Sequence, residues 1–172
     1  MALERQRITR DAVLEGAHSI LESGGYSDLT VDSLARSLRM SKSTLYKYFQ
    51  SKEHLLEALV EQACAETESE IDRIPAGQGL EAVVDVIGRH FQRLPRAVLI
   101  TPGALSRPSQ SRLGAVQDRL VTSARAAGGG PAFLPVALVA GANAAAVSVA
   151  RGDIQGERVA VVTAFGRIMA SA

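Results

Sequence analysis

The sequence is poor in aromatic residues and in sulfur. It contains no tryptophan, three tyrosines and four phenylalanines among 172 residues, and Cys64 is its only cysteine. A single cysteine excludes an intrachain disulfide and favours a reducing, cytoplasmic setting. We expect Cys64 to be an inert buried thiol, with a redox sensor as the alternative.

Patterns that accompany catalysis or metal binding are missing too. His18, His54, His90 and Cys64 form no cluster at metal-ligand spacing, and there is no glycine-rich phosphate loop. We therefore predict that the chain is not an enzyme and holds no metal ion or cofactor. His18 is expected to be half-buried and hydrogen-bonded, with a pH switch as the alternative.

No hydrophobic run is well suited to a membrane. The amino-terminal residues lack an apolar stretch, so we expect no signal peptide. Residues 126–150 carry no charge, but they are mostly alanine and glycine and include two prolines and Asn143. Such a stretch gains little from insertion into lipid. We predict a buried interface helix here, no membrane span and a cytoplasmic protein.

Charge is unevenly distributed, although the formal net charge is only +1. Residues 36–52 hold five Lys and Arg and no acid, whereas residues 53–72 hold seven acids and no Lys or Arg. A basic block followed by an acidic segment is typical of a head that binds a polyanion and a body that stays off it.

Apolar residues recur at helical spacing in nearly every segment, while strand signals are weak. Glycine and proline clusters divide the segments, most clearly at Gly24-Gly25 and Gly128-Gly129-Gly130-Pro131. The pattern predicts an all-α fold of about nine helices. They cover residues 10–23, 31–38, 42–49, a longer helix capped by Ser51, 79–93, 95–106 with an interruption near 101–103, 109–127, 132–150, and a last helix capped by Asp153 that ends near 170.

The second and third of these helices predict a helix-turn-helix. Thr30 and Ser41 are placed to cap them, and only Arg39 and Met40 separate the first helix from the second cap. With Leu45 and Phe49 facing the core, the outward face of residues 42–49 holds Ser43, Thr44, Tyr46 and Lys47 and no acid. Such a face suits a DNA major groove, but a solvated face on a small helical bundle fits it equally well.

Residues 9–60 resemble the head of the TetR/AcrR family of transcription regulators. The resemblance is carried by Gly25-Tyr26, Leu29-Thr30-Val31, Leu34-Ala35, Ser41 to Phe49, Ser51-Lys52-Glu53 and Leu55-Leu56, and its most specific part is the Thr-Leu-Tyr-x-x-Phe-x-x-Lys core that starts at Thr44. It implies that four residues face bases or nearby phosphates and that four more grip the DNA backbone. The first set is Lys42, Ser43, Thr44 and Lys47, and the second is Thr30, Tyr46, Tyr48 and Lys52.

Arg39 departs from the family, whose members usually have glycine in the turn. Either Arg39 adopts a left-handed conformation at some cost or the turn differs. We expect a solvated turn residue here, with an extra phosphate contact as the alternative.

The last two expected helices are apolar nearly all round, so both of their sides should be buried. A symmetry mate is the most economical second surface, and a tightly packed monomer core is the alternative. The resemblance likewise implies a homodimer joined through these two helices. The expected dimer seam consists of Ala140, Ala144, Val147, Val159, Val162 and Met169.

The resemblance also implies a small-molecule cavity between the middle helices, for which we name His90, Phe91, Leu94 and Leu120. Residues 53–172 contain only three aromatic residues, which favours a small or aliphatic effector. We expect a DNA-binding head over 1–52 and a sensing and dimerisation body over 53–172. The predicted function is a ligand-responsive repressor that binds a palindromic operator as a homodimer. The alternative is an architectural DNA-binding dimer that senses nothing.

Overall fold

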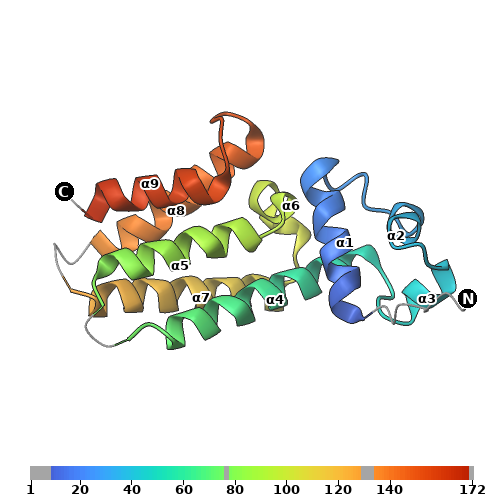
Figure 1. Cartoon of the computed structure of the whole chain (residues 1–172), viewed down its shortest axis with the longest axis horizontal. Helices are drawn as coiled ribbons and strands as arrows, with labels where there is room; N and C mark the ends of the chain where they lie inside the picture. Colours follow the sequence, from blue (N-terminus) through green and yellow to red (C-terminus); the bar gives the residue numbers. More distant parts are fainter. Residues whose placement is uncertain (1–8, 76–77, 129–133, 171–172) are drawn as a thin grey trace, which may run out of the picture.

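The structure is a computed structural model that describes residues 9–75, 78–128 and 134–170. These residues form nine α-helices, one short 3-10 helix and no strand, so the predicted all-α fold is confirmed. Figure 1 shows α1, α2 and α3 at one end of an elongated molecule and most of the other helices at the opposite end. The helices are α1 (Arg10–Ser23), α2 (Val31–Ser37), α3 (Lys42–Tyr46), α4 (Lys52–Asp72), α5 (Leu80–Arg93), α6 (Arg96–Ile100), α7 (Arg107–Ala126), α8 (Leu134–Arg151) and α9 (Arg158–Ala170), with the 3-10 helix η1 (Pro102–Ala104) after α6.

Side-chain caps begin the helices of the head where the sequence predicts them. The Thr30 hydroxyl accepts the Ser33 N–H at 3.0 Å, and the Ser33 hydroxyl accepts the Thr30 N–H at 2.9 Å. Ser41 accepts the Thr44 N–H at 3.2 Å, and Ser51 accepts the N–H three residues further on at 3.1 Å. These bonds satisfy N–H groups that have no partner within a helix, so each helix start is defined locally.

The core of the head continues into the body. Val13, Leu34 and Leu45 from the first three helices belong to the same buried cluster as Leu56 of α4 and Val98 of α6. α4 is 21 residues long and runs from the head into the body, as Figure 1 shows. The expected boundary between head and body at residue 52 therefore coincides with the start of α4, which belongs to both, and the packing is continuous across it.

The acidic stretch of α4 joins the helices of the body. Arg112 of α7 pairs with Glu68 at 2.6 Å and Glu61 at 3.2 Å. On the other side, Arg93 of α5 pairs with Glu66 at 2.9 Å and Glu70 at 2.5 Å. Five of the seven acids that suggested a body repelling a polyanion are thus paired with cations, and these pairs hold α5 and α7 against α4.

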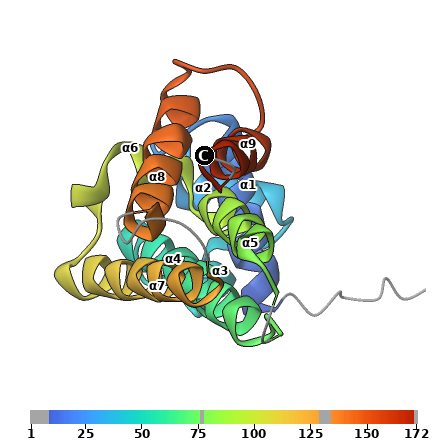
Figure 2. The same ribbon diagram turned by 90° about the vertical axis from the view of Figure 1, so that its left-hand side faces the viewer.

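The remaining helices complete a layered bundle. Figure 2 shows α8 and α9 side by side, with α4 and α7 on the opposite side and α5 in contact with both α4 and α9. The α5–α9 approach is close, because a Cβ added at Gly166 would lie 2.6 Å from a methyl group of Val84. One described helix, Leu134–Arg151, is long and apolar enough to cross a membrane, and 39% of its 18 residues are buried inside the structure.

Two expected helix boundaries are wrong. α3 ends at Tyr46, and residues up to Phe49 continue only as a turn in which the Phe49 N–H binds the Leu45 carbonyl at 3.1 Å. α9 begins at Arg158, so Asp153 does not cap it. Gly152 and Gly156 have positive φ angles of 85° and 128°, and the backbone between them turns before the helix starts.

Candidate nucleic-acid interface

α3 lies over the head core and presents a polar outer face. Leu45 and Phe49 are 4% and 5% exposed, and they hold the segment against α1 and α4. Ser43 and Lys47 are exposed, and Tyr46 is 52% exposed although it is a large aromatic residue. The exposed residues match the face expected from the helical spacing, and Lys47 is the cap residue at the carboxyl end of α3.

The hydroxyl groups at the start of α3 are bonded to one another. The Ser41 hydroxyl lies 2.9 Å from that of Ser43 and 2.8 Å from that of Thr44. Lys42 forms an ion pair with Asp32 of α2, between two side chains that are both more than half exposed. Exposed ion pairs contribute little stability, so Lys42 can leave Asp32 for a nearby phosphate at small cost.

Lys52 has a structural role that its place in the sequence does not reveal. Its ammonium group donates to the Tyr26 carbonyl and lies 3.6 Å from the centre of the Tyr26 ring. The Tyr26 hydroxyl donates to the Glu53 carboxylate at 3.3 Å. Burial lowers the pKa of Lys52, while the charges of Glu53 and Asp28 oppose that shift. These contacts join the start of α4 to the turn after α1, so any anion bound by Lys52 would have to share or replace them.

Arg39 adopts the left-handed conformation, with a φ of 52°. The Arg39 N–H binds the Arg36 carbonyl at 3.2 Å, and the Met40 N–H binds the Ala35 carbonyl at 2.9 Å, so the turn ends α2 as a glycine would. The Arg39 side chain is exposed. The alternative in which Arg39 takes a left-handed conformation, and the turn keeps its usual form, is therefore confirmed.

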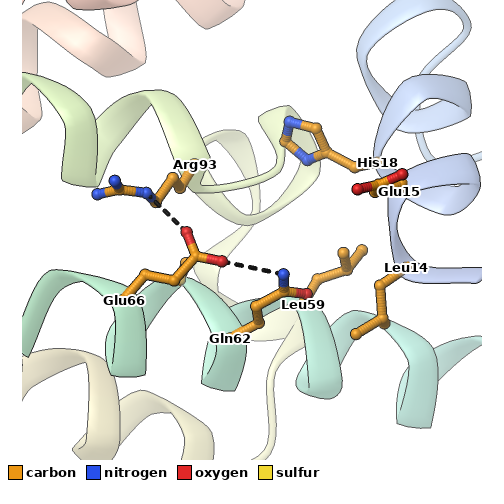
Figure 3. Close-up of a pocket in the computed structure, with 8 residues that line it drawn as sticks. Leu14, Glu15, His18, Leu59, Gln62, Glu66 and Arg93 are labelled. Atoms are coloured by element: carbon orange, nitrogen blue, oxygen red, sulfur yellow. Dashed lines mark hydrogen bonds and ion pairs between the residues drawn. The ribbon is translucent and has the colours of Figure 1, made fainter. Parts of the chain in front are cut away.

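A cavity of about 140 Å³ lies where the head meets the body. Figure 3 shows side chains from α1, α4 and α5 converging on it, among them Glu15, His18, Gln62, Glu66 and Arg93. Glu66 accepts from Gln62 at 3.0 Å and pairs with Arg93, so its carboxylate already has partners. His18 is half-buried as expected, and burial lowers its pKa, but its ring has no hydrogen bond within the described residues.

The four residues named for an effector cavity lie in the core of the body. His90, Phe91, Leu94 and Leu120 are all 0% exposed, and none of them lines the cavity in Figure 3. The Thr67 hydroxyl donates to the Ala63 carbonyl at 2.7 Å, so its oxygen must accept the Nδ1–H of His90 at 3.0 Å. Burial lowers the pKa of His90 to about 4. The ring is therefore neutral, and Nε2 is a buried acceptor with no partner in the described part of the chain.

The expected dimer seam is only partly on the surface. Ala140 and Ala144 of α8 are exposed and Val147 is half-buried. Val136 of α8 and Ile168 of α9 are large apolar residues that are 52% and 68% exposed. Val162 is 1% exposed and packs inside its own chain, so its assignment to the seam is wrong. Val159 is half-buried near Gly88, and the Met169 side chain lies outside the described residues.

Cys64 is fully buried, and burial raises the pKa of its thiol to about 11. A thiol in this state reacts slowly, which agrees with the expectation of an inert residue. In the described part of the chain, no group of three or more His, Cys, Asp or Glu is placed to hold a metal ion.

Sequence reasoning missed the residues that connect the head to the body. Glu22 of α1 pairs with Arg158 of α9 at 2.8 Å and accepts the Arg96 N–H at 3.1 Å. No sequence pattern in α1 or α9 marks Glu22 and Arg158 as partners, because the two residues are far apart in the chain. The one available signal is Arg158 itself, a charged residue at the start of a mostly apolar helix.

Comparison with known proteins identifies relatives of the head and of the whole fold. Residues 13–59 match a family described as bacterial regulatory proteins, tetR family. The HTH-type transcriptional repressor KstR of Mycolicibacterium smegmatis is 30% identical over 97 residues, which are 54% of this chain and 48% of that protein. This chain thus spans about half the length of the curated relative.

Two solved structures share the fold over nearly the whole chain. The TetR family transcriptional regulator PfmR from Thermus thermophilus has a TM-score of 0.66 at 22% identity, covering 93% of this chain and 97% of the other. The transcriptional regulator FadR from Bacillus subtilis, solved in complex with stearoyl-CoA, has a TM-score of 0.58 at 16% identity, covering 92% and 96%. At these identities the likeness concerns the fold.

Proposed function

This chain belongs to the TetR family of bacterial regulatory proteins, and on that premise we propose that it is a cytoplasmic, ligand-responsive repressor that binds a palindromic operator as a homodimer. The observation that carries the proposal is the outer face of α3, where Ser43, Tyr46 and Lys47 are exposed above a buried Leu45. An acid-free helical face of hydroxyls and a lysine suits the acceptors of a major groove.

The exposed apolar face of α8 and α9 supports the dimer. Val136 and Ile168 are large apolar residues at the surface, and the small exposed residues Ala140 and Ala144 of α8 allow a second helix to approach closely. A two-fold pair would present two identical reading helices. Simple tandem docking then places the half-sites about 34–36 Å apart, one turn of the duplex.

Ala144→Arg tests the dimer directly. Because Ala144 is exposed in the single chain, arginine can be accommodated there without disturbing the core, and only the paired form lacks room for it. We expect sedimentation of the variant to give a folded monomer, while Ala65→Arg on the exposed side of α4 stays dimeric. A monomeric unmodified protein at micromolar concentration would remove this part of the proposal.

Lys47 and Lys52 separate base reading from backbone contact. Lys47→Ala should relax discrimination at one position in each half-site, by about 1–3 kcal/mol. Lys52→Ala should weaken binding to all sequences and lower the salt slope by about 0.9 for each phosphate that the variant no longer neutralises. Because Lys52 also binds Tyr26, thermal unfolding of the variant must accompany the binding assay.

Binding-site selection on both lysine variants decides the docking. If Lys47→Ala kept the preferred sequence and Lys52→Ala changed it, the proposed placement of α3 in the groove would be wrong. An asymmetric target with a single half-site in footprinting would contradict the palindrome.

Ligand response is supported by Nε2 of His90, which has no partner among the described residues and could accept from a ligand hydroxyl or amide. The solved FadR was bound to stearoyl-CoA, which shows that a fold of this kind accommodates a ligand. The full burial of Phe91, Leu94 and Leu120 favours the second candidate function, an architectural DNA-binding dimer that senses nothing. A thermal-shift screen separates the two, because a ligand at 100 times its Kd adds roughly 2.7 kcal/mol to stability.

A further inference from the structure

We propose that the hollow where α1, α5, α6, α8 and α9 meet binds a small carboxylate ligand, and that this ligand takes the place of the Glu22 carboxylate on Arg158. The inference rests on the function proposed above, since it names the chemical class of the effector and where it binds. Its site lies apart from the predicted pocket at His90 and from the cavity in Figure 3.

The hollow already holds a carboxylate, which belongs to the protein itself. One oxygen of Glu22 accepts the backbone N–H of Arg96 at 3.1 Å, and the other lies 2.8 Å from Nη2 of Arg158. Glu22 is one third exposed, so its side chain can leave for solvent. The surroundings of Glu22 therefore define the chemistry that a replacing ligand must have.

Arg158 has an unused donor group at this site. Its side chain is 5% exposed, and Nη2 is shared between Glu22 and the Gln92 carbonyl at 3.3 Å. Nη1 is buried and has no hydrogen-bond partner within the described residues. A guanidinium binds a carboxylate best through two parallel hydrogen bonds. Glu22 contributes only one oxygen to it, so a ligand that engages both Nη1 and Nη2 satisfies one donor group more.

The size and lining of the hollow favour a carboxylate with a short apolar tail. Its volume is about 340 Å³, at the small end of the range for small-molecule sites. Arg96 and Arg158 face Glu22 and Glu157 here, so once Glu22 leaves, the lining keeps a single positive charge, which suits a monoanion better than a phosphate dianion. Val149 and Ala150 supply an apolar surface beside these charges.

Displacement of Glu22 would remove polar contacts that connect the head to the body. Among the described ion pairs, Glu22–Arg158 is the one that joins a helix of the head to the body. Glu22 also binds the first residue of α6, which lies between the head and the body in Figure 1. A ligand that takes both partners would leave the carboxyl end of α1 held to the body by apolar packing alone. We expect the angle between head and body, and with it the spacing of the two reading helices of a dimer, to be less strictly fixed.

Thermal unfolding of the full chain with sodium hexanoate tests the site, with acetate, inorganic phosphate and sodium chloride at equal ionic strength as references. We expect a saturable rise in the unfolding midpoint with hexanoate, of roughly 5–10 °C at 100 times Kd. Glu22→Gln should bind hexanoate at least fivefold more tightly, because the competing carboxylate is gone. Arg158→Lys should lose most of the affinity, and Glu81→Gln, at the far end of α5, should behave as the unmodified protein.

An increased affinity in Glu22→Gln is the decisive outcome, because a purely structural ion pair would show only a loss of stability. No saturable shift with hexanoate, an equal shift with phosphate, or unchanged affinity in Glu22→Gln would each overturn the inference. Anisotropy of a labelled operator duplex keeps the two proposals apart. A ligand-free protein that binds no duplex contradicts the proposed function, whereas duplex binding that hexanoate leaves unchanged contradicts this inference alone.

Discussion

Arg39 offers a measurement that separates backbone conformation from DNA contact. Its φ of 52° places an L residue with a full side chain in the left-handed region. Arg39→Gly and Arg39→Ala remove the same charge, and only glycine removes the Cβ. The left-handed conformation costs an ordinary residue about 1–2 kcal/mol. Glycine in turn gives the unfolded chain more freedom, which offsets about 0.4–1 kcal/mol.

The difference between these two terms sets the expected result. Arg39→Gly should be more stable than Arg39→Ala by about 0.5–1 kcal/mol. This is the reverse of the order expected inside a helix, where alanine is the better residue by about 1 kcal/mol. Urea unfolding at one fixed protein concentration measures this difference, since the stability of the proposed dimer would depend on concentration. Equal stability, or a more stable Arg39→Ala, would refute the reasoning from the turn.

The same pair of variants tests whether Arg39 touches DNA. The side chain is exposed in a turn, and we expect it to be solvated in the complex as well. The salt dependence of operator binding should then be the same for both variants and the unmodified protein. A slope that falls by about 0.9 per half-site in both would identify a phosphate contact instead.

Two further predictions concern the body. The hydrogen bond from Arg112 holds the pKa of Glu68 below its usual value, so this pair stabilises the fold fully above about pH 4.3, and the stabilisation is lost as pH falls through the lowered pKa. Glu68→Gln should therefore make the free energy of unfolding fall less steeply as the pH is lowered. An unchanged pH dependence in the acid range would contradict the pairing. Gly166→Ala should destabilise, because overpacking against Val84 costs about 1–3 kcal/mol and exceeds a gain of about 1 kcal/mol in helix propensity. Gly114→Ala, with open space around its Cβ, should instead stabilise by that gain, and equal effects of the two glycine substitutions in thermal unfolding would contradict the packing of α5 against α9.

Local sequence determined where the helices of the head begin and which face of α3 points outward. Thr30, Ser41 and Ser51 begin their helices as predicted, because a capping bond joins residues only three positions apart. The outward face of α3 likewise follows from the spacing of Leu45 and Phe49, whereas the sequence left two alternatives for the turn at Arg39, between which the structure decided. Interactions this close in sequence leave little for the rest of the molecule to decide.

Tertiary structure alone decided which charged and apolar groups meet across the fold. Lys52 reaches the Tyr26 carbonyl and Glu22 reaches Arg158 because packing brings α1 against the ends of α4 and α9. The inward face of Val162 was also unpredictable, since α9 is apolar on several sides and periodicity could not choose between them. Local hydrogen bonds and helical spacing depend on residues that are neighbours in the sequence, whereas burial and long-range ion pairs exist only once the helices have packed.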